Sequence, residues 1–108
     1  MSITVILYYK GTNGNALKFV SEIEESGIAT QIRNEPGNLR YDYFIPLNDK
    51  ETVLLIDTWK DQESIDAHHA SSMMQKLATL REKYDLHMIA ERYVSEDFSD
   101  HDQSVIRK

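Results

Sequence analysis

The chain has 108 residues, of which 41% are hydrophobic, and this length and composition predict one domain with a small core. Its 12 basic residues against 18 acidic ones give a net charge of −6, which makes nucleic acid a poor candidate partner. The absence of cysteine excludes a disulfide framework, a thiolate nucleophile and a Cys-ligated zinc site.

Residues 3–9 are rich in β-branched and aromatic side chains and predict a first strand. No basic region precedes this apolar run and no small-residue cleavage site follows it, so it does not resemble a signal peptide. No apolar stretch reaches the roughly 18 residues that a membrane helix needs. We therefore expect a cytoplasmic protein with no membrane partner.

A helix is predicted after the Gly-containing loop at residues 11–14, where Asn13 or Asn15 is a candidate N-cap. Its apolar stripe rotates beyond Gly27, which predicts a kink there. We expect the helix to end by Glu35, before a Pro-Gly pair.

The next two segments predict a hairpin. Residues 38–46 alternate in polarity around Tyr41 and Tyr43 and end at Pro46, which cannot continue a central strand. Residues 52–59 form a second apolar, β-branched run that ends at Trp59, the only tryptophan. A turn at residues 48–50 would pair the two strands.

A short helix is predicted after Asp61, a natural N-cap residue. Ile65, His68 and His69 share one side of this helix at i, i+3, i+4 spacing. Because they are adjacent, the side chains of His68 and His69 diverge by about 100° and cannot bind one ion as an i, i+4 pair does. The chain offers no metal motif, and we expect no metal cofactor.

A further helix is predicted from the Ser72–Gln75 capping box. Its narrow apolar stripe consists of Met73, Leu77, Leu80 and Tyr84. Residues 86–94 predict the last strand, and residues 95–108 form a polar tail that could dock on a partner.

The element order is strand, helix, strand, strand, helices, strand, which predicts an α+β, ferredoxin-like βαββαβ domain over residues 1–94 with an antiparallel sheet. In this fold the helices cover one face of the sheet. The first two strands are nevertheless apolar on both faces, so we expect a homodimer that packs through its sheet faces.

Trp59 has two interpretations. On pattern alone a large core or interface residue is favoured, and the alternative is an aromatic side of a ligand cavity. An inward histidine near this tryptophan would be a base that titrates close to neutral pH. The pattern leaves open whether His68 or His69 points inward.

Two segments, residues 35–41 (Glu-Pro-Gly-Asn-Leu-Arg-Tyr) and 59–68 (Trp to His), resemble the antibiotic biosynthesis monooxygenase superfamily. In that family an E-x-G-x-x-x-[YF] segment opens the second strand, and a helical His follows a strand-terminal aromatic. The resemblance spans about residues 3–94 and implies a dimeric α+β barrel. Members include enzymes that oxidise quinols or polyphenols with O2 without metal or flavin, heme-degrading proteins, isomerases of a phosphorylated autoinducer, and proteins of unknown role.

Carried over by position, the resemblance assigns His68 and Trp59 to the catalytic site. There are two departures from the family pattern. Met73 stands where many members have a second His, and an apolar or tyrosine residue (Leu7, Tyr8) stands where the heme-degrading members have Asn. The first departure bears on the catalytic machinery, and the second argues against heme.

Our leading hypothesis is a cofactor-independent monooxygenase that oxidises a small quinol or phenolic compound with O2. The aromatic ring would lie against Trp59, and His68 would take the hydroxyl proton. One alternative is an isomerase of a small phosphorylated carbonyl compound, with Arg40 or Lys60 holding the phosphate. Another is a dimeric ligand-binding or stress-related module with no catalysis. The residues expected to contact the substrate are Tyr8, Tyr41, Tyr43, Asp57, Met73 and Leu77.

Overall fold

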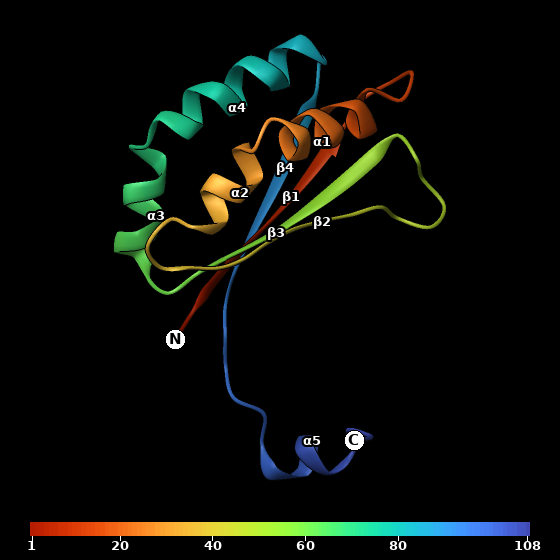
Figure 1. Ribbon diagram of the computed structural model, residues 1–108. Coiled ribbons are helices and arrows are strands. Elements are labelled where there is room, and N and C mark those ends of the chain that lie inside the picture. The colour runs from red at the N-terminus through yellow and green to blue at the C-terminus, as the bar shows by residue number, and fades with distance from the viewer.

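The computed structural model describes residues 1–108 and contains four strands and five helices. Figure 1 shows the helices α1 to α4 gathered on one side of the sheet, with α5 standing apart near the C-terminus. In chain order the elements are β1 (Ile3–Lys10), α1 (Asn15–Glu25), α2 (Ile28–Arg33), β2 (Asn38–Phe44), β3 (Thr52–Trp59), α3 (Gln62–His69), α4 (Ser72–Lys83), β4 (His87–Val94) and α5 (Asp100–Ser104).

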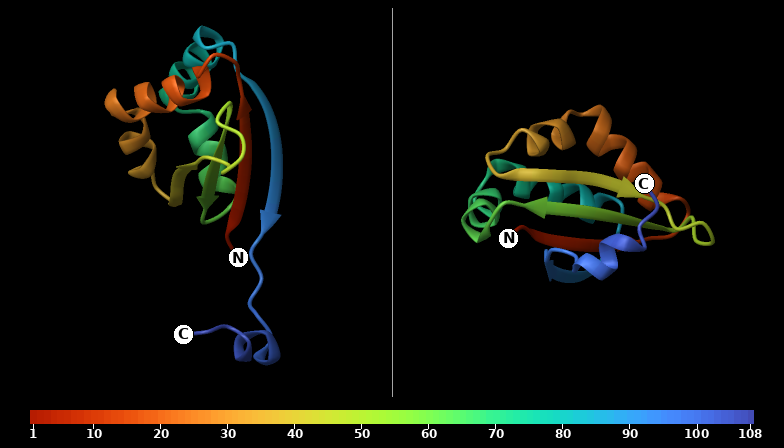
Figure 2. Two further views of the ribbon diagram at one scale, coloured as in Figure 1. Left: turned by 90° about the vertical axis from the view of Figure 1, so that its right-hand side faces the viewer. Right: turned by 90° about the horizontal axis from the view of Figure 1, so that it is seen from below.

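The sheet has the strand order β2-β3-β1-β4, and every neighbouring pair is antiparallel. The two outer strands enclose β1 and β3, and both crossover segments lie on the same face, as the two views of Figure 2 show. This arrangement confirms the predicted ferredoxin-like α+β fold.

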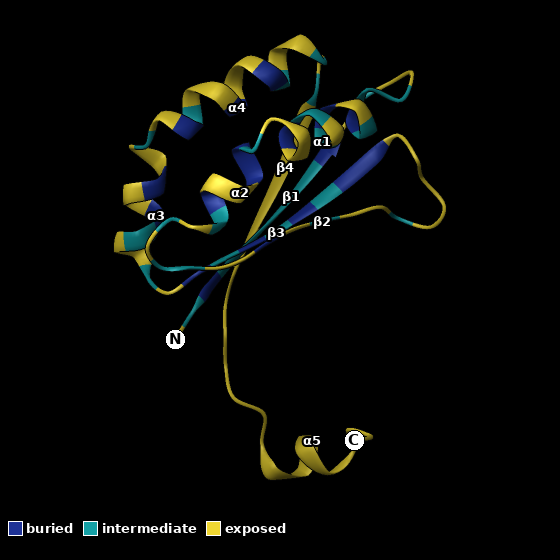
Figure 3. Cartoon of the chain, viewed as in Figure 1, coloured by how far each residue is buried: buried dark blue, intermediate teal, exposed yellow.

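Strand alternation decides which side chains meet the helices. In β1 the helix-covered face carries Ile3 and Tyr9, which are both buried, and in β3 it carries Leu55 and Trp59. Side chains from α1, α2 and α4 complete the core, and the dark segments of Figure 3 trace it along the inward sides of these elements. The opposite face has no covering layer, and we call it the open face.

Several local expectations are confirmed. The helix breaks at Gly27, whose φ of 83° lies in the left-handed region, so that α1 and α2 form separate segments. The last helical residue before Pro36 is Arg33, as the Pro-Gly signal indicated. The Asp61 carboxylate accepts a 2.8 Å hydrogen bond from the Ser64 amide and so caps α3.

Three local predictions are wrong. The N-cap of α1 is Gly14 in a left-handed conformation, and neither Asn13 nor Asn15 caps the helix; the Asn15 side chain donates instead to the Tyr84 carbonyl. The N-cap of α4 is Ser71, so Ser72 already lies inside the helix and its capping box does not form. Strand β2 stops at Phe44, before the Pro46 that was expected to end it.

Every residue of β4 is exposed, and the chain beyond it leaves the sheet (Figure 1). The Ser95 amide still bonds the Ser2 carbonyl at 2.9 Å, but α5 and its flanking residues are exposed throughout. The tail presents three exposed large apolar side chains, Phe98, Val105 and Ile106. No helix has the length and apolar character that crossing a membrane requires.

Candidate functional site

A cavity of about 310 Å³ lies between the helix-covered face of the sheet and helices α3 and α4. We call it the sheet–helix cavity. Its surface is mostly apolar, with side chains such as Leu7, Leu55 and Leu77, which is typical of sites for small organic ligands. Besides Tyr41 and the indole of Trp59, its polar side chains are Asp57, Gln62, His68, His69, Arg81 and Arg92.

Trp59 and His68 meet in the surface of this cavity. Trp59 is the last residue of β3 and is 1% exposed, while His68 lies in the last turn of α3 and is 4% exposed. The capped turn at Asp61 folds α3 back over the strand end. The two rings consequently stack with centroids 4.7 Å apart and an interplanar angle of 29°. His68 is thus the inward histidine of the pair, and His69 is exposed.

The imidazole of His68 is oriented by Glu35. Its Nδ1 lies 3.0 and 3.1 Å from the two carboxylate oxygens of Glu35. A carboxylate can only accept, so Nδ1 carries the ring proton in the neutral imidazole and Nε2 is the basic nitrogen. No protein group hydrogen-bonds Nε2, which leaves it available to a ligand.

Gly37 permits this pairing by letting the loop before β2 approach α3. Its φ is 84°, and a Cβ built on it would overlap the Ser64 hydroxyl and lie 2.6 Å from the Ser64 Cβ. The Gly37 carbonyl also accepts a 2.8 Å bond from the Lys60 amide. The glycine of the E-x-G segment therefore positions the glutamate of the same segment beside the histidine.

Asp57 is a buried carboxyl in the same cavity. It is 7% exposed, and its Oδ1 has no hydrogen-bond partner in the protein. Burial raises the pKa of Asp57 to about 7, the nearby Glu35 carboxylate adds to this effect, and the Trp59 indole opposes it. Asp57 is therefore a proton donor or acceptor that changes state close to neutral pH.

Arg81 reaches the cavity from α4. Its Nη2 donates a 3.1 Å hydrogen bond to the Tyr9 hydroxyl, and its guanidinium lies 5.6 Å from the centroid of the Tyr9 ring. Its Nε is buried without a partner. The cavity thus contains two buried polar atoms without a protein partner, one on Asp57 and one on Arg81.

The other expected substrate contacts divide into two groups. Tyr41 and Leu77 line the cavity. Tyr8 does not, because the alternation of β1 turns it to the open face, where its hydroxyl donates to Glu91 at 2.9 Å. Tyr43 does not line the cavity, and its hydroxyl donates a 3.3 Å hydrogen bond to the Tyr41 hydroxyl. Met73 is buried in the core. Tyr8, Tyr43 and Met73, which were expected to contact the substrate, therefore do not line the cavity.

Sequence reasoning overlooked several residues around the cavity, among them Arg92, Glu35, Arg81 and Met74. Glu35 is the first residue of the E-x-G segment that resembles the family, so the sequence did contain a signal that could have identified it. Arg81 lies four residues after Leu77 on the apolar stripe of α4, a spacing that predicts the same inward side. Met74, the residue after Met73, is the methionine that lines the cavity, and no sequence signal separated the two.

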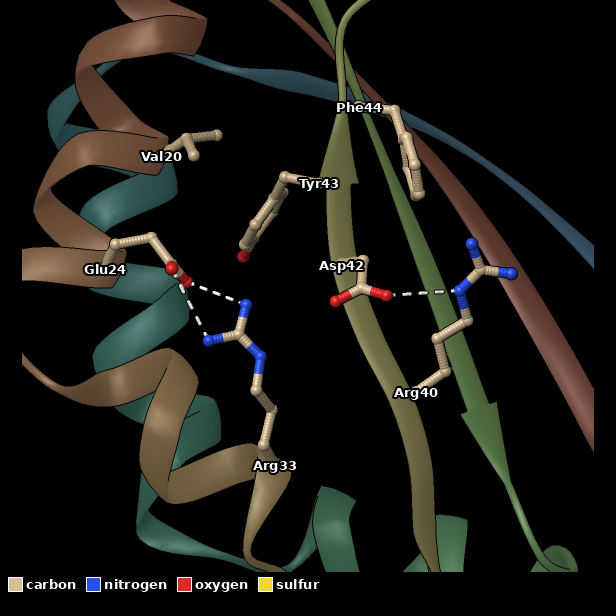
Figure 4. A pocket seen from close by; sticks show the side chains of 7 residues that line it. All are labelled: Val20, Glu24, Arg33, Arg40, Asp42, Tyr43 and Phe44. Atoms are coloured by element: carbon tan, nitrogen blue, oxygen red, sulfur yellow. Dashed lines mark hydrogen bonds and ion pairs between the residues drawn. The ribbon is translucent and has the colours of Figure 1, made fainter.

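A second hollow, of about 610 Å³, lies at the edge strand β2. Figure 4 shows its charged side chains engaged with one another: Arg33 with Glu24 at 2.9 Å, and Arg40 with Asp42 at 3.2 Å. Its charges are thus already neutralised, unlike those of the sheet–helix cavity. Neither Arg40 nor Lys60, the residues considered for holding a phosphate, lines the sheet–helix cavity.

No group of three or more His, Asp or Glu side chains is arranged to hold a metal ion. The free Nε2 of His68 and the buried carboxyl of Asp57 are two groups of the cavity that can transfer a proton.

The family model for antibiotic biosynthesis monooxygenases matches residues 2–80. The chain belongs to this family. No curated protein gives a significant sequence match to the chain.

Solved structures share its fold at low identity. A Deinococcus radiodurans protein assigned to the antibiotic biosynthesis monooxygenases is 16% identical, with a TM-score of 0.77 over 93% of this chain and 97% of that one. SnoaB from Streptomyces nogalater, described as a cofactor-independent oxygenase, is 13% identical, with a TM-score of 0.76 over 92% and 97%. A Nitrosomonas europaea protein with the same family assignment is 18% identical, with a TM-score of 0.74 over 88% and 98%.

Proposed function

We propose that the protein is a cofactor-independent monooxygenase that oxidises a small quinol or phenolic compound with O2. The observation that carries the proposal is the free Nε2 of His68, on an imidazole that Glu35 orients and Trp59 stacks against, in the surface of a largely apolar cavity. Family membership and the fold shared with SnoaB, a cofactor-independent oxygenase, support the same chemistry.

In the proposed reaction the substrate ring lies near Trp59, and His68 Nε2 removes a hydroxyl proton. The resulting anion is electron-rich and supplies the electrons that reduce O2. For a hydroquinone the balance is one quinol and one O2 giving one hydroxyquinone and one water, with four electrons passing from the ring to oxygen. The protein contributes desolvation, orientation and proton transfer.

The test is oxygen consumption with a series of hydroquinones. We expect His68→Ala to lower kcat by about 10²–10⁴-fold, the usual contribution of a positioned general base. His87→Ala, which removes an exposed histidine outside the cavity, is the matched control and should retain wild-type rates. Equal rates for His68→Ala and wild type would reject this role for His68.

The rival functions are weaker. A non-catalytic module would be favoured by a solvent-facing His68, whereas the side chain is buried. The isomerase hypothesis placed phosphate on Arg40 or Lys60, which lie outside the cavity. Heme binding would be detected as a Soret shift on titration with hemin, and we expect none.

The proposal includes a homodimer formed through the open face, a domain that spans residues 1–94, and a C-terminal tail over residues 95–108. We also propose that the protein works in the cytoplasm, which is consistent with a chain that contains no cysteine.

A further inference from the structure

The arginines of this chain fall into two classes. Arg33 and Arg40 each pair with a carboxylate close to them in space. Arg81 and Arg92 make no ion pair, and both line the sheet–helix cavity. Arg107, also without an ion pair, lies in the exposed tail. In a protein with a net charge of −6, it is notable that the two unpaired arginines of the folded domain converge on one cavity.

Arg81 is held in place before any ligand arrives. Its partner Tyr9 is fully buried, and the Tyr9 ring packs against Phe19 with centroids 5.0 Å apart. One edge of the guanidinium is therefore used by the Tyr9 hydroxyl, while Nε–H remains buried without an acceptor. The other terminal nitrogen, Nη1, makes no hydrogen bond within the protein and, unlike Nε, is not buried, so it can donate to an acceptor that a ligand supplies.

The sheet register places Arg92 across the cavity floor from Asp57. Val5 of β1 pairs with Asp57 on one side and with Arg92 on the other, so the two residues lie two strands apart, about 10 Å. Asp57 is the only carboxylate in the cavity surface, because Glu35 lies behind His68 and is paired with it. Two cations thus face one acid, and the acid is partly protonated near neutral pH because burial raises its pKa to about 7.

We infer that the substrate is an anionic aromatic compound, a hydroxylated ring that bears a carboxylate, and that Arg81 binds this carboxylate through its unpaired Nη1 with Arg92 as a second, more exposed cation. The inference rests on the proposed function in taking this cavity as the substrate site. It adds that binding depends on a negative charge, which a neutral quinol lacks. Arg81 is then a specificity-determining residue.

The test is equilibrium binding of an unreactive pair, meta-hydroxybenzoate and its neutral analogue meta-hydroxybenzamide. Trp59 is the only tryptophan and lines the cavity, so its fluorescence reports occupancy directly. We expect the carboxylate to bind wild type at least about tenfold more tightly than the amide, as a charge-assisted bond to a half-buried guanidinium provides. Arg81→Gln should abolish this preference, and Arg92→Gln should reduce it.

Arg107→Gln is the matched control, since it removes an unpaired arginine outside the cavity, and it should retain the full preference. Arg81→Lys keeps the charge and should retain part of it. Arg92 lies on an exposed strand, so its substitution tests the inference even if Arg81→Gln unfolds. Equal affinities for the two ligands in wild type, or an unchanged preference in both glutamine variants, would overturn the inference.

Binding is measured without turnover, so the two proposals fail separately. Oxygen consumption with neutral quinols but no preference for the carboxylate would reject the anion inference alone. A carboxylate preference that depends on Arg81, with no oxygen consumption by any quinol or hydroxybenzoate, would reject the monooxygenase and retain the anion site.

Discussion

At the scale of single residues, the cavity contains two ionisable side chains, Asp57 and His68, whose surroundings differ. Asp57 is a carboxyl buried beside Trp59 with one oxygen unpaired. His68, by contrast, has one nitrogen fully engaged with Glu35 and the other free. The first arrangement favours a protonated acid, and the second leaves Nε2 available to exchange a proton with a ligand.

The pKa of Asp57 predicts how stability depends on pH. The folded-state pKa is about 7, above the unfolded value of about 4, so the folded state binds the proton more tightly and the free energy of unfolding falls as pH rises from about 4 to 7. Three pKa units correspond to an upper bound of about 4 kcal/mol. We expect Asp57→Asn to be more stable than wild type at pH values above this range and similar to it below.

Urea denaturation across this pH range measures the effect. Asp66→Asn, which changes an exposed carboxylate on α3, is the control and should show no such pH-dependent gain. A constant difference between Asp57→Asn and wild type at every pH would contradict the assignment.

At the scale of elements, the close approach of the loop before β2 to α3 builds the Glu35–His68 pair. Two glycines with positive φ allow a comparison. A Cβ at Gly37 would collide with Ser64, whereas a Cβ at Gly27 would have no atom within 4 Å. The backbone conformation is unfavourable for alanine at both positions, and the steric overlap exists only at Gly37.

We therefore expect Gly27→Ala to lower the free energy of unfolding by about 1 kcal/mol, from backbone strain alone. Gly37→Ala should lower it by about 2–4 kcal/mol, because overpacking against Ser64 is added to the strain. Chemical denaturation of the two variants measures the difference. Equal losses of unfolding free energy in the two variants would contradict a steric requirement for glycine at position 37.

At the scale of the whole molecule, the open face of the sheet carries contiguous apolar side chains. Ile6 of β1 pairs directly with Ile56 of β3, and Tyr8 pairs with Leu54. At the outer strands Phe44, Ile89 and Tyr93 are exposed. An uncovered apolar sheet face of this kind favours association with a second copy, which typically buries roughly 800 Å² on each partner.

We expect a mass of twice the chain in light scattering at micromolar concentration. Ile56→Arg should give a monomer, because dimerisation would have to remove water from a charge at the centre of the face. Thr79→Arg, on the exposed side of α4, should leave the mass unchanged. A monomeric mass for the wild-type protein would reject the dimer.

Short-range patterns were enough to predict most of the fold. Runs of β-branched and aromatic residues, with alternating polarity at residues 38–46, located the strands, the rotated apolar stripe located the break at Gly27, and Asp61 located the start of α3. The errors at Asn15 and Ser72 concern single cap residues, where several polar side chains compete and the local backbone decides. The family resemblance assigned His68 to the site, but the sequence pattern left open which histidine points inward, and the stacking of His68 on Trp59 decided it.

The partners of these residues follow from contacts between segments far apart in the chain. Glu35 reaches His68 across 33 positions because Gly37 lets two elements touch, and Arg81 reaches Tyr9 across 72. The unpaired atoms of Asp57 and Arg81 exist only because packing removes water from one side of the sheet. Sequence periodicity thus specified which elements form and which sides they bury, whereas the burial and pairing of charges, and with them the chemistry of the cavity, were established by tertiary packing.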